Sequence, residues 1–248
     1  MLSIRRAISI AGLDRAEGAP WSGGPRQQID WALSLGVGAV QIDGTIAGLR
    51  ARELDQSARR DLAAVLRRSG AMCSGLDIWV PAAHFVDAGQ QDRAVDAITE
   101  ACGLAADLRR LGAIDGLAVV SIATHETTPK HLMDRLALNA EHVGVTVADH
   151  RWPRTAESLG FGIDPAAVLL AGEDPSLVVS RTASRTGEPP AAARLSDLSA
   201  VGRCVAGRGR LKRDEYEVAL TIAKFSGWLV IDLRGLPIQA EAAAELTA

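Results

Sequence analysis

Four aspartates in the second half of the chain each follow a short apolar run. They are Asp149 after HVGVTVA, Asp164 after LGFGI, Asp197 after ARLS and Asp232 after GWLVI. An apolar run of this length is typical of a buried strand, and the carboxylate lies where that strand leaves the core. A single aspartate there is commonly a helix N-cap or a turn former. Their recurrence predicts that acids from distant parts of the chain meet at one edge of a sheet, where they could move protons or hold a cation.

Two histidines occupy similar positions. His84 follows DIWVPAA and His125 follows VVSIAT. Carboxylates and imidazoles at one edge supply ligands for a divalent cation, and the oxygen ligands favour Mg²⁺, Mn²⁺ or Co²⁺ over zinc. A histidine at a strand end is more often a capping or hydrogen-bonding residue than a metal ligand. His150 is adjacent to Asp149, and only one of the two can point inward because neighbouring strand residues face opposite ways.

Arginines are frequent around the last predicted loops. The set comprises Arg181, Arg185, Arg194, Arg203, Arg208 and Arg210. Within the segment GRGR, Arg208 and Arg210 could offer guanidinium groups to an anion, and the glycines could offer backbone N–H groups. In (β/α)8 barrels phosphate often binds near the loops after strands seven and eight. A solvated loop in which arginine favours solubility is the alternative.

The elements that must position these residues alternate along the whole chain. Apolar runs predict strands at 6–12, 37–43, 72–80, 116–123, 143–149, 161–164, 193–198 and 227–235. Amphipathic runs with Pro or Gly at their ends predict helices at 25–35, 51–70, 91–112, 129–144, 212–227 and 238–248. Alternation of this kind predicts βαβ units, and eight strands close as a barrel. We therefore predict an α/β protein, a single (β/α)8 TIM barrel domain over residues 1–248.

Two segments depart from this regular alternation. The segment RWPRTAESLG (151–160) is too short for an ordinary helix with its connections, which predicts a shortened fifth βα unit. The segment SRTASRTGEPPAA (180–192) is polar and contains Pro and Gly, which predicts a mobile loop.

Composition narrows the class of partner. With 248 residues, 48% of them hydrophobic, the chain can bury a sizeable core, and its net charge of −3 argues against nucleic acid or an anionic membrane surface. No apolar run reaches the roughly 20 residues of a membrane span. Cys73, Cys102 and Cys204 lack CxxC spacing, which favours a reducing, cytoplasmic location. The N-terminal MLSIRRAISIAGL is interpreted as a first strand rather than a signal peptide.

Several long runs carry a family resemblance. The runs at 36–70, 75–85 and 92–108, together with GRGRLKRDEYEVALTIAKFSGWLVIDLRG at 207–235, are similar to the sugar phosphate isomerase/epimerase family. This family belongs to the xylose isomerase-like TIM barrel superfamily, which also includes AP endonucleases. The resemblance covers nearly the whole length, and it implies a barrel whose site lies at the C-terminal ends of the strands.

The resemblance also implies roles for individual residues. Family members of the isomerase type bind one divalent metal through Glu, Asp, His and Glu after strands five to eight, and the two Glu residues move a proton beside a carbonyl. These positions correspond here to Asp149, Asp164, Arg194 and Asp232. The implied catalytic residues are Asp149, Asp232 and His84. The implied substrate-binding residues are His125, Arg194, Asp197, Arg208 and Arg210, and a weakly bound Mg²⁺ or Mn²⁺ would be held by Asp149, Asp164 and Asp232.

The metal site nevertheless departs from the family pattern. Asp149 and Asp232 are one methylene shorter than glutamate, and Ala167 occupies the position of the family's second histidine. Arg194 cannot ligate a cation at all. We therefore expect a degenerate metal site. Arg194 either replaces the positive charge of the cation and contacts the acids or an anionic substrate, or it pairs with Asp149 or Asp232 in an inactive site.

Two functional hypotheses remain open. One is an isomerase or epimerase acting on a small polar or phosphorylated sugar-like ligand through its strand-end carboxylates. The other is a non-catalytic barrel that binds a sugar-like ligand or a protein partner, with a homo-oligomer possible in either case. A phosphodiesterase of the AP endonuclease type is disfavoured, because such enzymes need a cluster of metals and a basic DNA-binding surface.

Overall fold

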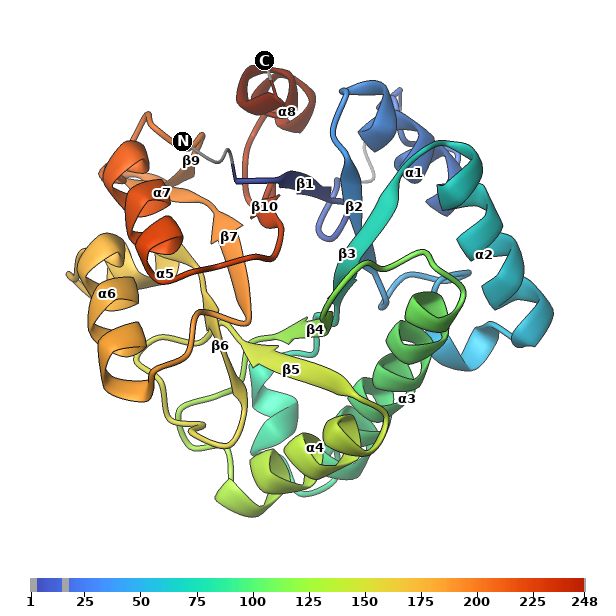
Figure 1. The fold of residues 1–248 in the computed structure, drawn as a ribbon, viewed down its shortest axis with the longest axis horizontal. Helices are drawn as coiled ribbons and strands as arrows, with labels where there is room; N and C mark the ends of the chain where they lie inside the picture. The colour runs from blue at the N-terminus through green and yellow to red at the C-terminus, as the bar shows by residue number, and fades with distance from the viewer. Residues whose placement is uncertain (1–3, 15–17, 248) are drawn as a thin grey trace.

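The eight predicted strands form a closed parallel barrel (Figure 1). The structure is a computed structural model and describes residues 4–14 and 18–247. The barrel strands are β1 (Arg6–Ser9), β2 (Ala39–Asp43), β3 (Met72–Asp77), β4 (Ala118–Ile122), β5 (Val145–Asp149), β6 (Gly160–Ile163), β7 (Ala192–Leu195) and β10 (Leu229–Ile231). Each pairs with its neighbours along the chain, and β10 closes the barrel on β1. The predicted α/β fold, a (β/α)8 TIM barrel, is confirmed.

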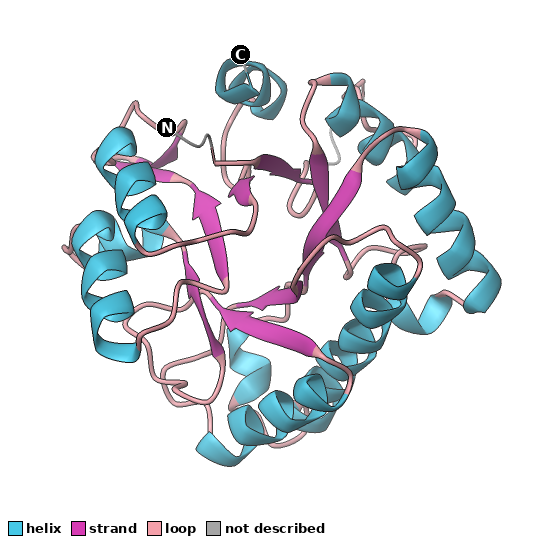
Figure 2. Ribbon diagram, viewed as in Figure 1, coloured by secondary structure: helices cyan, strands magenta, loops and turns pink. Residues whose placement is uncertain are grey.

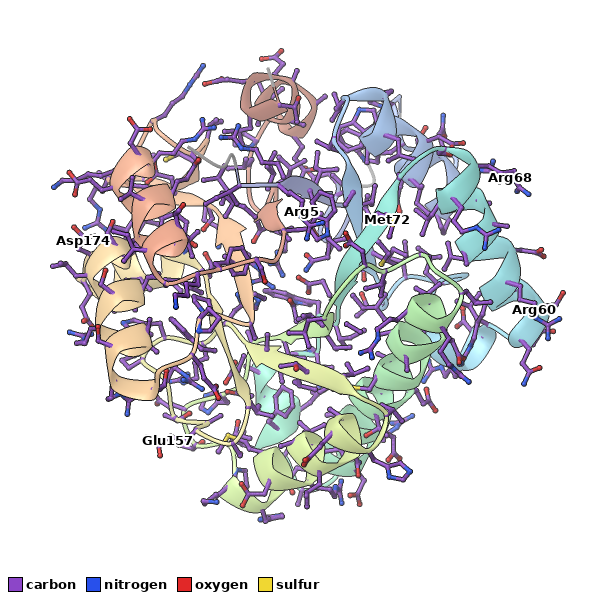
Figure 3. The ribbon with its side chains drawn as sticks, viewed as in Figure 1. Arg5, Arg60, Arg68, Met72, Glu157 and Asp174 are labelled. Carbon is purple, nitrogen blue, oxygen red and sulfur yellow. The ribbon has the colours of Figure 1, made fainter. Side chains whose placement is uncertain are left out.

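Helices surround the barrel (Figure 2). They are α1 (Pro25–Ser34), α2 (Gln56–Arg68), α3 (Gln91–Arg110), α4 (Lys130–His142), α5 (Pro165–Leu170), α6 (Pro175–Thr186), α7 (Arg213–Ile222) and α8 (Gln239–Thr247), with short 3₁₀ turns η1 (Ala51–Glu53) and η2 (Ala82–Phe85). The amphipathic pattern explains their orientation, as in α2, where Leu62 and Leu66 are buried. Arg60 and Arg68 project from the outer side of the same helix (Figure 3). Among the described residues, no helix is both long and apolar enough to cross a membrane.

Two of the predicted loops contain regular structure. The prediction of a loop over 180–192 is wrong for its first half, because α6 continues to Thr186. Asp174 caps this helix by accepting from Ser176 N at 2.8 Å, and its buried Val178 and Val179 hold it against the core. The second case is the Gly/Arg segment after β7, where β8 (Asp197–Ser199) and β9 (Gly202–Cys204) form an antiparallel hairpin. Residues 150–159 join β5 to β6 through irregular backbone, with no helix among them.

Strand side chains that point out toward the helices are large, whereas those that point into the barrel are small. Outward residues such as Ile8, Ile42 and Leu76 belong to the main core beneath the helices. Inward residues form two separate small clusters, Ala7 with Ala39 and Val230, and Val119 with Ala148 and Ala192. Barrel interiors are usually filled by bulky branched residues. The small inward residues therefore leave space at both ends of the barrel.

Candidate functional site at the C-terminal mouth of the barrel

A cavity of about 760 Å³ opens where the strands end at their carboxyl termini. Its wall includes Asp43 from the end of β2, His150 after β5, Asp164 after β6 and Arg194 on β7. Trp79 gives it an apolar surface, with 58% of that residue exposed. This volume suits a ligand of small-molecule size, and the C-terminal face is where TIM barrels carry their sites.

Arg194 lies at the centre of a buried ion-pair network. The residue is 3% exposed. Its Nη2 donates to Asp77 Oδ2 at 2.7 Å, its Nη1 to Asp164 Oδ2 at 3.5 Å, and its Nε lies 3.8 Å from Asp232 Oδ2. Arg194 thus contacts Asp232, one of its two expected partners, and Asp77, which was not among the expected partners. Its ion pairs among the described residues do not include Asp149, the other expected partner.

Two further arginines complete the network. Arg203 on β9 donates to Asp164 Oδ2 at 3.1 Å and to Asp232 Oδ2 at 2.8 Å. Arg234 follows β10 and makes a bidentate contact with Asp232, through Nε at 2.9 Å and Nη2 at 2.7 Å. The hairpin that sequence analysis missed is therefore what brings Arg203 over the mouth. Arg203 and Arg234, together with Arg194, balance the three carboxylates of Asp77, Asp164 and Asp232.

The guanidiniums keep Asp164 and Asp232 in their charged form. Burial alone would raise the pKa of Asp164, but Arg203 and Arg194 outweigh burial and keep the pKa below its ordinary value. The same balance applies to Asp232, where Arg234 and Arg203 lower the pKa further. The ion pairs in turn raise the pKa values of Arg203 and Arg234, although burial opposes this. Asp164 and Asp232 are consequently weak proton acceptors.

The residues at the mouth do not fit a divalent metal. Of the predicted ligands Asp149, Asp164 and Asp232, the last two share Arg203 as a partner, whereas Asp149 is hydrogen-bonded elsewhere. No group of three His, Cys, Asp or Glu side chains placed to hold a metal occurs in the described part of the chain. Three guanidiniums occupy the surroundings of the acids instead, and their charges would repel a cation.

At the end of β5, His150 rather than Asp149 points into the cavity. Asp149 shares the outward side of β5 with Val145 and Val147, both in the main core. Its Oδ2 accepts from Thr124 Oγ1 at 2.6 Å, and its Oδ1 accepts from the backbone N–H groups of Thr124 and Arg151, both at 3.0 Å. Asp149 thus anchors the turns that follow β4 and β5, whereas His150 lines the cavity.

His150 is held as a neutral imidazole. Burial lowers its pKa well below the ordinary value, and the nearby Arg194 charge lowers it further. Its Nε2 lies 3.1 Å from Ser121 Oγ, and this hydroxyl accepts a hydrogen bond from Gln41 Nε2 at 3.3 Å. A side chain at Gly162 would come within 2.9 Å of the imidazole ring, so glycine on β6 makes room for it.

Asp43 is a site residue that sequence analysis missed. It ends β2, and both Thr45 N at 2.7 Å and Thr45 Oγ1 at 2.5 Å donate to its Oδ1. Its Oδ2 makes no hydrogen bond with the described residues. Burial raises the pKa of this carboxyl, against the lowering effect of the Thr45 hydrogen bonds. The signal was present in the sequence, because AVQID and GLD end in aspartate like the four runs of the second half.

The remaining predicted residues lie outside the cavity wall. His84 is half-buried on η2, and His125 Nδ1 contacts Thr127 Oγ1 at 2.9 Å; neither lines the cavity. Arg208 pairs with Glu245 on α8, and Arg210 donates to the Leu169 carbonyl at 2.7 Å. The contacts of these two arginines do not bring them together at the mouth, where a bound phosphate was predicted.

Asp197 organises the chain that follows it. Its carboxylate is fully buried and accepts from the backbone N–H groups of Leu198, Gly207, Gly209 and Leu211, at 2.7 to 2.9 Å. These four bonds fix residues 197–211, including the hairpin that carries Arg203. Gly209 is required here, because a Cβ would lie 2.5 Å from Asp197 Oδ1. Substrate binding by Asp197 stays a prediction.

Solved structures with this fold come from several bacteria. A xylose isomerase domain protein from Planctomyces limnophilus superposes with a TM-score of 0.72 at 15% identity, covering 98% of this chain and 94% of that one. A sugar phosphate isomerase/epimerase from Parabacteroides distasonis gives 0.69 at 12% identity, with 100% and 95% covered. A xylose isomerase-like TIM barrel protein from Mycobacterium smegmatis, in complex with magnesium, gives 0.66 at 12%, with 99% and 94% covered.

The resemblance expected from sequence is therefore confirmed at the level of the fold. No protein-family model matches the chain. No curated protein matches it in sequence either. The fold is that of xylose isomerase-like TIM barrels, and similarity of fold does not by itself establish an activity.

Proposed function

We propose that this protein is an isomerase or epimerase that moves a proton on a small, polar, sugar-like substrate at the barrel mouth, without a divalent metal. The observation that carries the proposal is that Asp43 and His150 both lie in the wall of one cavity. Their surroundings shift their pKa values in opposite directions relative to ordinary Asp and His. Such pairs are a recurrent way in which active sites separate acid and base roles.

Asp43 is the proposed base. A raised pKa makes a carboxylate a better proton acceptor, and Asp43 Oδ2 is not engaged by the described residues. His150 is the proposed partner, which as a neutral imidazole can exchange a proton or hydrogen-bond to a substrate oxygen. Its contact with Ser121 Oγ holds the ring in place.

The arginine network would stabilise the charge that develops. Removing a proton beside a carbonyl places negative charge on the carbonyl oxygen, and positioned cationic donors lower the energy of that state. Arg203 is the most accessible member of the network, with 26% of its side chain exposed. Trp79 offers an apolar surface on which a sugar ring could pack.

The sequence-based assignment of proton transfer to Asp149, Asp232 and His84 stays a prediction. To accept a proton, Asp149 would have to give up a hydrogen bond to Thr124 or Arg151. Asp232 would have to give up an ion pair with Arg203 or Arg234. Either step costs more than protonating Asp43, which favours Asp43 as the base.

A second candidate function is a non-catalytic barrel that binds a sugar-like ligand. The same ion-pair network favours it, because Asp164 and Asp232 are neutralised by Arg203 and are not free for chemistry. A cavity with an apolar Trp79 and donor groups would still bind a polyol or a sugar phosphate.

The test is proton exchange at a substrate carbon. The protein is incubated in D₂O with a panel of aldoses, ketoses and their phosphates, and deuterium uptake is followed by NMR with EDTA, Mg²⁺ or Mn²⁺ present. We expect exchange in EDTA, and a loss of about 10²- to 10⁴-fold in Asp43→Asn and in His150→Asn. Asp61→Asn, an exposed position on α2, is the matched control and should be unchanged.

Other outcomes would change the assignment. Exchange that survives both Asp43→Asn and His150→Asn but is lost in Asp149→Asn would restore the sequence-based assignment. Exchange that appears only with Mn²⁺ or Mg²⁺ would overturn the metal-independent mechanism. A silent panel together with thermal stabilisation by one of its sugars would favour the binding protein.

A further inference from the structure

A second cavity lies at the opposite, N-terminal end of the barrel. It encloses about 390 Å³ and is lined by residues that directly precede strands: Arg5 before β1, Leu117 before β4, Leu159 before β6, Ala191 before β7 and Trp228 before β10. Figure 3 labels Arg5 beside β1 and β10 in the barrel wall. None of the proposed mouth residues Asp43, His150 and Arg203 lines it.

The cavity has an aromatic wall and a polar inner end. Phe161, Phe225 and Trp228 supply the wall. Gln41 and Ser121 lie at the inner end, where Gln41 is 3% exposed and donates through Nε2 to Ser121 Oγ. The Oε1 atom of Gln41 is buried and has no partner among the described residues. A buried acceptor without a donor is unfavourable, so Gln41 favours an occupant that carries a hydrogen-bond donor.

Arg154 brings a cation to the same cavity. Its guanidinium lies over the Phe161 ring, 5.3 Å from the ring centre, and its Nη2 donates to the carbonyls of Ala156 and Leu159. Its Nε is buried without a hydrogen-bond partner. The ion pairs among the described residues do not include Arg154. Burial lowers its pKa. This guanidinium is therefore a charged donor that an anion would satisfy.

The other charged groups of this cavity are already paired or face solvent. Arg5 pairs with Asp115 and lies over the Trp228 ring at 4.2 Å. Glu157 contacts Arg185 at 3.6 Å, with 85% of its side chain exposed. Glu188 is exposed. Arg154 is thus the cation of this cavity that forms no ion pair with a described residue, although the charges of Asp149 and Glu157 act on it from a greater distance.

We propose that the N-terminal cavity binds a small aromatic carboxylic acid that also carries a hydroxyl or amino donor. The carboxylate contacts Arg154, the ring packs between Phe161, Phe225 and Trp228, and the donor reaches Gln41 Oε1. The volume agrees with the lower end of known ligand sites. The proposal does not rest on the proposed function, because its residues lie at the other end of the barrel.

The site is connected to the mouth through hydrogen bonds. Gln41 donates to Ser121 Oγ, and Ser121 Oγ lies 3.1 Å from His150 Nε2. A ligand that bonds to Gln41 Oε1 would therefore contact the chain of side chains that ends at His150. This arrangement links an occupant of the N-terminal cavity to His150 at the mouth.

The experiment uses 4-hydroxybenzoate as the probe, titrated by calorimetry and by thermal denaturation of the full chain. Benzoate lacks the donor and 4-hydroxybenzamide lacks the charge. We expect 4-hydroxybenzoate to bind and to stabilise, and each analogue to bind at least tenfold more weakly. Arg154→Met should weaken binding of 4-hydroxybenzoate at least tenfold. The matched control Arg181→Met, which alters an exposed arginine paired with Glu173, should leave it unchanged.

Two further variants locate the binding. Ala192→Leu fills the cavity and should abolish binding; if it does not fold, Arg154→Met and Arg181→Met decide the question. Arg203→Met alters the mouth and should not change the affinity. Absence of binding would overturn the proposal, as would binding that is lost in Arg203→Met but kept in Arg154→Met. A failure here leaves the D₂O exchange assay at the mouth unaffected, so the two proposals fail separately.

Discussion

The two ends of this barrel differ in how their arginines are paired. At the C-terminal mouth, Arg194, Arg203 and Arg234 are all paired with carboxylates. At the N-terminal end, Arg154 has no ion pair with the described residues and Gln41 Oε1 has no donor. Burying a charge is costly unless a partner compensates it, so the mouth is stabilised internally, whereas the other end gains from an added ligand. The comparison indicates that the guanidiniums at the mouth are neutralised by carboxylates of the protein itself, whereas Arg154 is not.

The largest expected effect is on stability at the mouth. Arg194→Met leaves Asp77 and Asp164 buried beside an uncharged side chain, and we expect it to lower the free energy of unfolding by about 3–5 kcal/mol. Arg154→Met should cost less, about 1.5–3 kcal/mol, because it removes the hydrogen bonds to the Ala156 and Leu159 carbonyls but no ion pair with a described residue. Urea denaturation of both variants measures the contrast. Equal losses would show that the two ends do not differ as described.

A smaller loss of stability is expected at Asp197, whose carboxylate is balanced by backbone N–H groups rather than by guanidiniums. Asp197→Asn removes one acceptor oxygen and the charge that receives four N–H groups, and should cost about 1.5–3 kcal/mol. The loss should release the hairpin that carries Arg203. Hydrogen exchange of residues 197–211 checks this, with Asp61→Asn as the control. Unchanged protection would contradict an anchoring role for Asp197.

Acid should destabilise the mouth more than the other end. The pKa values of Asp164 and Asp232 are held below their ordinary value of 3.8. Their contribution to stability is therefore complete well above pH 3.8 and is lost as the pH falls below it towards the folded-state values. We expect the free energy of unfolding to drop steeply below about pH 4, and Arg194→Met to flatten that drop. Arg154→Met should keep the wild-type pH dependence of the free energy of unfolding. A flatter pH dependence in both variants would contradict the difference between the two ends.

The smallest effect concerns Asp43, whose pKa is raised by burial. Because the pKa of Asp43 is raised in the folded protein, its ionisation lowers the free energy of unfolding. This loss is absent below the ordinary pKa of 3.8 and develops as the pH rises through the folded-state pKa. Asp43→Asn removes this loss, because the amide stays neutral and can still accept from Thr45. We expect Asp43→Asn to be up to about 1 kcal/mol more stable than wild type at pH 7. Denaturation at pH 7 and pH 3 measures the difference, which should vanish at the lower pH. A less stable Asp43→Asn at pH 7 would argue that Asp43 is a structural anchor.

Local patterns predicted the barrel but not all of its elements. Each barrel strand was expected within a few residues of its position, because apolar runs between Gly and Pro signals are local in the sequence. Helix α6 was missed because its polar second half resembles a loop, while its burial depends on packing against α7. The hairpin β8–β9 was missed because its strands are three residues long and are fixed by the buried Asp197.

The sequence by itself determined that acids such as Asp164 and Asp232 would follow strands of one sheet, since the position of an aspartate after an apolar run is a local property. Only the tertiary structure decided which side chains meet. Asp149 and His150 are adjacent, and strand alternation sends the first outward and the second into the cavity. Arg194 and Asp77 are separated by 117 positions, and they form an ion pair only because closure of the barrel directs β3 and β7 toward one axis. Charge pairing at such separations is set by barrel geometry, which no local pattern records.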